Sequence, residues 1–193
     1  MSDILEENSI YSKHHLSFFD KIVHKKRIEM INIINQTIQN QSLYDVLDVG
    51  TTIDEKNISS NSIIKNLNRF KIYKSISDQE IKLKLFNKCL QKSITDDLTD
   101  DEIKNFSSDL VISNATIEHV GNEENQLKMI KNIISLNKKY FIIITPNRYH
   151  PIEFHTKIPF IHWLPKKIHR KTLSIIGLKF LSREENLNLL SKN

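Results

Sequence analysis

The sequence is poor in the residues that build specialised scaffolds. It contains a single cysteine, Cys89, so an internal disulfide is excluded and a reducing compartment is expected. Because its neighbours are largely apolar, Cys89 is expected to be a small buried residue rather than a catalytic thiol. Only three of the 193 residues are glycine and four are proline, which excludes a collagen-like chain and disfavours a disordered one. We therefore expect a globular chain.

Long apolar runs are also missing from the sequence. No stretch approaches the ~18 consecutive apolar residues that a membrane-spanning helix requires. The amino-terminal MSDILEENSI lacks the basic-then-apolar pattern of a secretion signal. A cytoplasmic protein is expected on both grounds. The net charge of +5 is thinly spread along the chain, so it does not by itself indicate a nucleic-acid partner.

Short apolar runs alternate with segments of helical periodicity. The inner runs are continuously apolar, which is typical of strands buried on both faces of a parallel sheet. This alternation predicts an α/β fold, Rossmann-like and doubly wound, with a mainly parallel sheet and helices on both faces. The predicted strands are 43–50, 70–76, 88–94, 108–114 and 138–146.

The predicted helices fill the intervals between these strands. The first covers about 14–39, with a possible break at the HKKR segment 24–27, and a second follows a cap at Ser59 or Ser60. Residues 81–86 suggest a short helix or an extra extended piece, while 100–106 and 124–136 are clearer helices. A last helix is expected from Ser182, where a capping box with Glu185 is possible. We expect one domain over 1–193, with a helical segment 1–40, a cofactor-binding core 41–147 and a lid or substrate segment 148–193.

Polar residues follow the predicted strands, where open α/β sheets bind their ligands. A dinucleotide site there would need G-x-G-x-x-G, and a phosphate-binding loop would need G-x-x-x-x-G-K-[ST]. Neither motif occurs, and Gly50 is the single glycine in the turn directly after the first predicted strand. NAD and FAD are therefore disfavoured as cofactors.

Three segments together resemble a known family. LYDVLDVGTT (43–52), SDLVISNATIEHV (108–120) and FIIITPN (141–147) are similar to motifs I, IV and V of the class I S-adenosylmethionine-dependent methyltransferases. The resemblance covers about residues 40–150 and implies S-adenosylmethionine as cofactor. It implies these cofactor contacts: Asp48, Gly50 and Thr51 at the methionine end, Ile94 or Thr95 at the adenine, and Asn114 at the reacting methyl.

The resemblance leaves the ribose contact open between Ser75 and Asp78. Asp78 is the better chemical choice, because a carboxylate can accept hydrogen bonds from both ribose hydroxyls. The chain also departs from the family in two ways. Thr51 and Thr52 stand where motif I usually has further glycines, and the family's closing antiparallel strands are missing. We therefore expect a chain that is truncated, or rearranged over 150–193.

The dipeptide Glu118–His119 follows the fourth predicted strand. With the later TPN and a further histidine, it resembles the type 11 and ubiquinone-pathway O-methyltransferases. It is also similar to the E-x-x-E-H metal motif of small-RNA 2′-O-methyltransferases, with Ala115 in place of the first acid. Three interpretations are open: His119 is a general base assisted by Glu118, a divalent metal ion is bound by Glu118, His119 and His155, or Glu118 caps the next helix while His119 packs against the lid.

The histidines downstream do not form a zinc signature. Spacings of five, seven and seven separate His150, His155, His162 and His169, and structural zinc sites usually need tighter spacing or cysteines. His155, in the stretch H-P-x-E-x-H, is the expected site member, whereas His162 and His169 are expected at the surface or in the lid.

Segment 157–180 mixes aromatic and aliphatic residues with lysine and arginine. It is either a lid helix packed on the core or a peripheral contact with a membrane surface that admits a lipid-linked substrate. Nucleic acid is not favoured as a partner, because no stacking platform is visible. The expected activity is O-methylation of a small or lipid- or sugar-linked hydroxyl; the alternatives are RNA 2′-O-methylation and a non-catalytic cofactor-binding or scaffolding role.

Overall fold

The computed structural model describes residues 18–54, 60–153 and 155–191, and the chain divides into two compact units. Of the described residues, the sheet unit comprises 18–54, 60–114 and 128–143. The histidine unit comprises 115–127, 144–153 and 155–191. None of the described helices is long and apolar enough to cross a bilayer.

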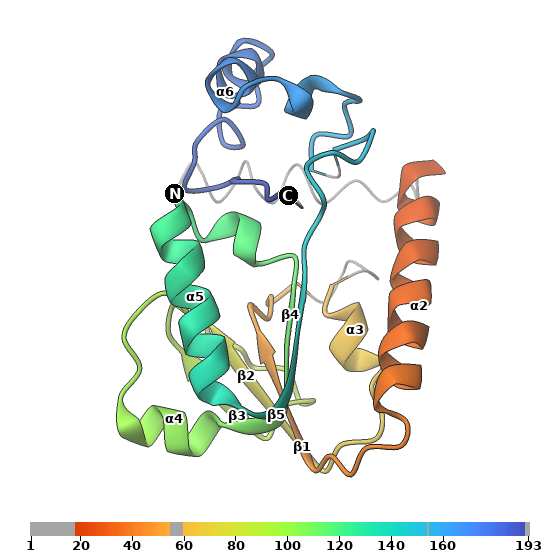
Figure 1. Ribbon diagram of the computed structural model, residues 1–193, viewed down its shortest axis with the longest axis vertical. Helices are drawn as coiled ribbons and strands as arrows, with labels where there is room; N and C mark the ends of the chain where they lie inside the picture. The colour runs from red at the N-terminus through yellow and green to blue at the C-terminus, as the bar shows by residue number, and fades with distance from the viewer. Residues whose placement is uncertain (1–17, 55–59, 154, 192–193) are drawn as a thin grey trace. The chain divides into compact units, whose positions relative to one another are not determined.

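A five-stranded sheet forms the centre of the sheet unit, in the order β3-β2-β1-β4-β5 (Figure 1). β1 pairs in parallel with both β2 and β4, and β2 pairs in parallel with β3. Every residue of β1 and all but the last of β4 are buried, as expected for strands covered on both faces, and each strand also holds buried polar side chains. The strands are β1 (Asp45–Val49), β2 (Ile72–Ser77), β3 (Lys88–Gln91), β4 (Ser108–Asn114) and β5 (Asn137–Ile144).

Helices cover both sides of this sheet. In Figure 1, α2 (Phe18–Ile38) and α3 (Ser62–Lys65) lie on one side, and α4 (Asp100–Phe106) lies on the other with the part of α5 (Glu123–Leu136) that follows Leu127. Along α5, Met129, Ile133 and Leu136 are buried at helical spacing. The predicted doubly wound α/β fold is confirmed.

Several local predictions about the sheet unit are wrong. α2 runs unbroken through 24–27, because lysine and arginine favour a helix. Asn61, rather than Ser60, precedes α3, and Ser59 lies outside the described residues. Residues 81–86 are neither helix nor strand, and Cys89 is exposed because β3 is an edge strand.

The histidine unit has a small core of its own. Leu173, Leu181, Leu187 and Leu189 are buried together, and η2 (Ile161–Trp163) and α6 (Lys166–Ile175) precede the last three. The predicted helix from Ser182 does not form: its hydroxyl donates to the Lys179 carbonyl at 2.7 Å in a run of turns. Leu181 and Leu187, six residues apart, would lie on different faces of a helix and could not both enter this core.

Candidate functional site

The strand order reverses beside β1, which places a topological switch point at the carboxyl ends of β1 and β4. The backbone turns sharply after β1: Gly50 has φ 88°, and its N–H donates to the Ile76 carbonyl at 2.9 Å. A residue with a side chain rarely adopts this φ, so the turn requires glycine at position 50. A short backbone turn is thereby held at the edge where such sheets bind ligands.

Asp48 is buried near this turn, and its side-chain hydrogen-bond network within the described residues consists of hydroxyl groups. Thr51 Oγ1 donates to Asp48 Oδ2 at 2.6 Å, and Ser75 Oγ donates to Thr51 Oγ1 at 2.9 Å. Within the described ranges no basic side chain pairs with Asp48. Burial raises the pKa of Asp48 to about 6, an increase that the Thr51 hydrogen bond only partly offsets. Among the described residues the carboxylate therefore has no counter-charge, which suits it to a cationic ligand.

An asparagine stabilises the loop that follows Gly50. Asn61 Nδ2 donates to the Thr52 carbonyl at 2.8 Å, and the Thr52 N–H donates to Asn61 Oδ1 at 3.1 Å. Ser77 Oγ donates to the Thr51 carbonyl at 2.7 Å. Neither Asn61 nor Ser77 was predicted from the sequence to have this role. The one signal is that asparagine tolerates the left-handed conformation that Asn61 adopts, with φ 54°.

The other predicted cofactor residues lie at the same edge of the sheet. Asp78 is exposed directly after β2, whereas Ser75 is fully buried within that strand. Asn114 is the last residue of β4 and is half-buried. Ile94 is buried and Thr95 half-buried, after β3. Because parallel strands end at one edge, the structure brings all of these positions to it.

Asn132 holds the segment after β3 in place. Its side-chain amide donates to the carbonyls of Ile94 and Asp96, at 2.6 and 2.9 Å. The loop that carries Ile94 and Thr95 is thus tied to α5 by two hydrogen bonds. Sequence reasoning did not predict this contact, because a half-buried asparagine in an amphipathic helix gives no signal of its tertiary partner.

In the histidine unit, Glu118 lies in η1 (Ile117–His119) and is fully buried. Its Oε2 accepts a hydrogen bond from Thr145 Oγ1 at 3.0 Å. Its Oε1 has no hydrogen-bond partner in the part of the chain that the structure describes, and lies 4.0 Å from His155 Nε2. The interpretation that Glu118 caps the next helix is wrong, since Asn122 Oδ1 accepts from the Asn125 N–H at the start of α5.

Two imidazole rings meet beside Glu118. The Nε2 atoms of His119 and His155 are 3.1 Å apart. His119 Nδ1 lies 2.6 Å from the Asn186 carbonyl, and His155 Nδ1 lies 2.6 Å from Glu153 Oε1. Each Nδ1 faces an acceptor and so carries a proton, which leaves both Nε2 atoms directed at one point. Sequence reasoning predicted His155, but it missed the roles of Glu153 and the Asn186 carbonyl.

The pKa shifts show how this pair shares a proton. Burial and the neighbouring charge of His155 lower the pKa of His119. Burial also acts to lower the pKa of His155, but the hydrogen bond and charge of Glu153 outweigh it and raise that pKa. Burial acts to raise the pKa of Glu153, yet its hydrogen bonds from His155 and Thr156 bring it to about 2. A proton shared between the two Nε2 atoms therefore favours His155 over His119.

The cluster also fits a divalent metal ion. One ligand atom each from Glu118, His119 and His155 lie within 4.8 Å of one another. Two nitrogens bound at about 2.0 Å to a tetrahedral metal would be separated by roughly 3.3 Å, close to the Nε2–Nε2 distance here. The partners at Nδ1, a carbonyl and a carboxylate, are those that orient metal-binding histidines. The unbonded Glu118 Oε1 would complete a set of three protein ligands.

The remaining histidines do not join this cluster. A position at the surface or in the lid is predicted for His162 and His169; the surface position is wrong, because both are buried, within the segment 148–193 that is predicted as the lid. His162 Nε2 lies 2.7 Å from the His150 carbonyl, so the ring supports the loop before η2. His150 itself is exposed. His169 is buried on α6, and its Nε2 has no hydrogen-bond partner among the described residues.

Comparison with known proteins finds no matching protein-family model and no matching curated sequence. Among solved structures, the chain is similar to the N-methyltransferase NodS from Bradyrhizobium japonicum WM9 in complex with S-adenosyl-L-homocysteine: the identity is 9%, the TM-score is 0.46, and the match covers 72% of this chain and 69% of that one. It is also similar to coclaurine N-methyltransferase bound to N-methylheliamine and S-adenosyl-L-homocysteine, with 11% identity, a TM-score of 0.44 and coverage of 94% and 49%.

Proposed function

We propose that the chain is an S-adenosylmethionine-dependent methyltransferase acting on the hydroxyl of a small or lipid- or sugar-linked acceptor. The observation that carries this proposal is Asp48, a buried carboxylate without a basic partner among the described residues, beside the switch point of the sheet. The methyl donor has an ammonium group and a sulfonium, so it supplies the positive charge that Asp48 lacks. Binding would in turn favour the ionised carboxyl.

The donor would be held by the carboxyl edge of the sheet unit. Asp48, Gly50 and Thr51 would bind its methionine end, and Asn114 would lie at the methyl group. Asp78 is preferred over Ser75 for the ribose, because Ser75 is fully buried and already donates to Thr51. Ile94 and Thr95 would contact the adenine, supported by the hydrogen bonds that fix their loop to Asn132.

The acceptor would be prepared by the cluster in the histidine unit, which begins four residues after β4 ends at Asn114. Burial lowers the pKa of His119, and its Nε2 lies on the side of the ring away from the Asn186 carbonyl. It would accept the hydroxyl proton by exchanging its contact with His155 Nε2 for one with the acceptor oxygen. The hydroxyl oxygen would form a bond to the methyl carbon while the carbon–sulfur bond breaks and its electron pair stays on sulfur. Alignment of oxygen, carbon and sulfur would supply most of the acceleration.

A divalent ion in the cluster would lower the pKa of the acceptor hydroxyl. Two imidazoles and one carboxylate would hold it, a set that suits Mn²⁺, Fe²⁺ or Zn²⁺ better than Mg²⁺. Glu153 and the Asn186 carbonyl would keep the two rings in their binding tautomers. His155 would then give up the proton that it otherwise shares with His119.

Calorimetric titration with S-adenosylhomocysteine tests the donor site. The intact chain should bind, and Asp48→Ala should weaken binding by at least about tenfold through loss of a charged hydrogen bond. Asp101→Asn, which changes an exposed carboxylate on α4 of the same unit, is the matched control and should bind normally. A folded chain that does not bind the ligand would overturn the proposal.

Titration with Mn²⁺ and Zn²⁺ separates the two roles of the cluster. If a metal ion is bound, Glu118→Gln and His155→Gln should each reduce its affinity, while His150→Gln, an exposed histidine of the same unit, should not. If no metal binds, the general-base role of His119 stands, and His119→Gln should abolish methyl transfer without changing S-adenosylhomocysteine affinity.

A further inference from the structure

The segment around α6 has an unusual distribution of charge. Residues 154–183 contain seven lysine and arginine residues and no aspartate or glutamate. Arg170 pairs with Glu184, beyond this segment, at 2.8 Å. Lys167, Lys171 and Lys179 are exposed and form no ion pair within the described ranges. A concentrated positive charge is therefore presented to the surroundings of the histidine unit.

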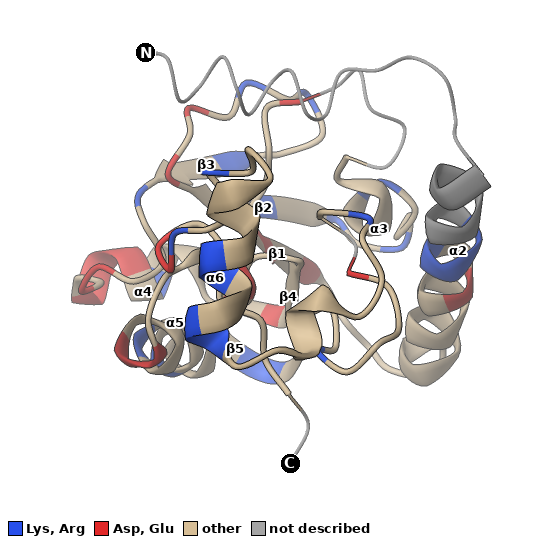
Figure 2. Cartoon of the chain, turned by 90° about the horizontal axis from the view of Figure 1, so that it is seen from above, with Lys and Arg blue, Asp and Glu red and all other residues tan. Residues whose placement is uncertain are grey.

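α6 itself has one buried face and one exposed face. His169 and Leu173, four residues apart, are buried. On the opposite side Ile168 and Ile175 are 52% and 75% exposed, with Lys167 and Lys171 next to them. Figure 2 shows the basic residues of α6 as blue bands, without acidic residues between them. Two large aliphatic side chains thus lie in solvent, flanked by lysines.

Further apolar side chains continue this surface on both sides of α6. Phe160 precedes η2 and Trp163 is its last residue. Both are exposed, and their rings form an edge-to-face pair with centroids 4.9 Å apart. η2 packs against α6. Leu164 and Ile176 are exposed as well, next to the two ends of the helix. Single exposed apolar residues are ordinary on a protein surface, but several exposed apolar residues close together and flanked by lysines are not.

We infer that this surface, the α6 surface, binds the anionic face of a lipid bilayer. We define it by Phe160, Trp163, Leu164, Lys167, Ile168, Lys171, Ile175 and Ile176. Amphipathic helices that lie on membranes insert aliphatic side chains and leave lysines at the level of the lipid headgroups. Anionic headgroups complement the charge, and tryptophan is enriched at the boundary between lipid and water. The inference does not depend on methyl transfer.

A bilayer explains the composition of the α6 surface better than RNA does. Nucleic acids would use the lysines and Trp163, but aliphatic side chains offer no flat face on which bases stack. Exposed Ile168, Ile175 and Ile176 would remain in water in such a complex. In a bilayer the same three side chains leave water, so both the apolar and the basic residues find partners.

Sedimentation of the full chain with lipid vesicles tests this inference. We expect binding to vesicles in which about a third of the lipid is phosphatidylglycerol, and little binding to phosphatidylcholine alone. Lys167→Glu with Lys171→Glu should weaken binding roughly thirtyfold or more, since each lysine near the surface contributes about 1 kcal/mol. Ile168→Ser with Ile175→Ser should weaken it about tenfold at unchanged charge. Trp163 is the one tryptophan of the chain, so its fluorescence should shift to the blue on binding.

The controls replace exposed residues elsewhere. Ile33→Ser with Ile134→Ser removes two exposed isoleucines from α2 and α5, and Lys128→Glu with Lys131→Glu reverses two exposed lysines of α5. Both control variants should bind vesicles like the native chain. Absence of binding to anionic vesicles would overturn the inference. So would binding that is indifferent to the isoleucine pair and is displaced by oligouridylate, because that result would identify a nucleic-acid surface.

Discussion

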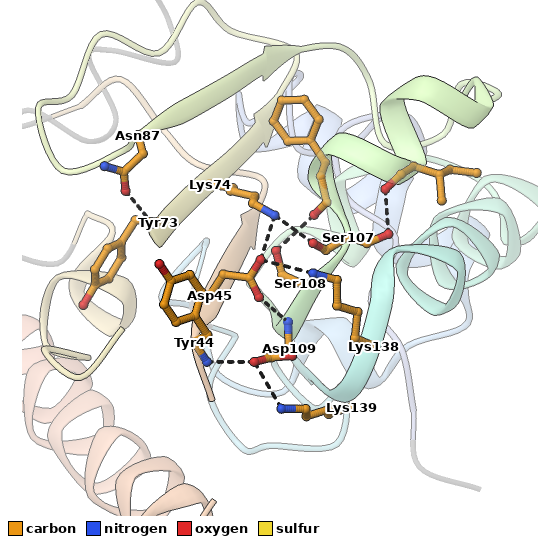
Figure 3. Close-up of polar contacts among 12 residues, drawn as sticks. Tyr44, Asp45, Tyr73, Lys74, Asn87, Ser107, Ser108, Asp109, Lys138 and Lys139 are labelled. Carbon is orange, nitrogen blue, oxygen red and sulfur yellow. Dashed lines mark hydrogen bonds and ion pairs between the residues drawn. The ribbon is translucent and has the colours of Figure 1, made fainter. Parts of the chain in front are cut away.

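Two buried aspartates on β1 have opposite environments. Asp45 accepts from Lys74 Nζ at 2.8 Å, from Lys138 Nζ at 3.4 Å and from the Asp109 N–H at 2.7 Å (Figure 3). Burial acts to raise its pKa, but these hydrogen bonds and charges leave it below the ordinary value. Asp48, three residues later, is also buried; among the described residues only Thr51 donates a hydrogen bond to its carboxylate, and burial raises its pKa to about 6. Burial alone therefore does not distinguish a structural carboxylate from a binding one; its partners do.

The same contrast extends along the two edges of the sheet. At the amino edge, Asp109 accepts from the Tyr44 N–H at 2.7 Å, and its carboxylate lies 3.3 Å from Lys139 Nζ. Lys74 Nζ also donates to the Ser107 carbonyl at 2.7 Å (Figure 3). At the carboxyl edge the buried partners of Asp48 are uncharged hydroxyls. At the amino edge the buried carboxylates are paired with lysines. At the carboxyl edge, in the function we propose, a cationic ligand would balance the charge of Asp48.

Removing the charge partner of Asp45 should have the largest effect. Lys74→Met leaves the Asp45 carboxylate buried with only the half-exposed Lys138 nearby, which should lower the free energy of unfolding by about 3–5 kcal/mol. Urea denaturation at neutral pH measures this change. Lys71→Met, an exposed lysine just before β2, is the control and should change stability little. An equal small effect of both substitutions would contradict the comparison.

Neutralising Asp48 should have the opposite sign. Asp48→Asn should raise the free energy of unfolding at pH 8 by about 1–3 kcal/mol, because it removes a buried charge that has no basic partner in the described part of the chain. The same substitution should abolish binding of S-adenosylhomocysteine. Urea denaturation and calorimetry on one preparation measure both effects. A variant that is less stable than the native chain at pH 8 would show that the ionised carboxylate is satisfied in the native fold.

The pH dependence of that difference follows from the direction of the shift. The folded pKa of about 6 lies above the unfolded value of about 4, so the folded state binds the proton more tightly. Below pH 4 the carboxyl is protonated in both the folded and the unfolded state, so its burial does not lower the free energy of unfolding. Between about pH 4 and pH 6 the native chain loses this contribution to stability, and the loss is complete above pH 6. The Asp48→Asn variant should lack this part of the pH profile, which urea denaturation across that range measures.

Backbone strain after β4 gives a smaller effect. Ala115 has φ 55°, a conformation that is costly for a residue with a side chain, and its N–H donates to the Ile144 carbonyl at 2.8 Å. Ala115→Gly should raise the free energy of unfolding by about 0.5 kcal/mol, since glycine relieves the strain but loses more chain entropy on folding. Thermal and urea denaturation measure it. A destabilised variant would show that the methyl group of Ala115 is needed for packing.

The smallest effect is expected at the exposed part of the amino edge. Lys139 is 46% exposed and lies 3.3 Å from a carboxylate oxygen of Asp109. Lys139→Met should cost less than about 0.5 kcal/mol, because solvent and salt screen a half-exposed ion pair. Urea denaturation at low and high salt measures it. A cost near that of Lys74→Met would mean that the network acts as a unit rather than through its buried pair.

The sheet could be read from the sequence because each strand carries its own signal. Continuous apolar runs predict β1 and β4, and Thr99 with Glu102 begins α4 through a capping box that sequence rules recognise in general. A similar pattern at Ser182 fails, because Leu181 and Leu187 must both enter the core of the histidine unit. Local signals are reliable only where tertiary packing agrees with them.

The candidate site was predicted in part for the same reason. Glu118 and His119 follow the predicted strand 108–114. His155 lies in the stretch H-P-x-E-x-H, which follows the predicted strand 138–146. Glu153 looks like any acidic residue of a loop, and its burial against His155 depends on the folded chain. The partner of His119 is a main-chain carbonyl, at Asn186, which no side-chain pattern encodes.

That difference between the two supports has an evolutionary consequence. A main-chain carbonyl is present whatever residue occupies position 186, so a mutation there leaves the acceptor for His119 in place as long as the backbone keeps its course. Position 153 has no such tolerance, because only a carboxylate can accept from both the ring and the N–H of His155 while balancing its charge. Among descendants of this gene, we expect codon 153 to be held by purifying selection more strictly than codon 186, where the side chain makes one hydrogen bond, to the Phe180 carbonyl at 3.0 Å.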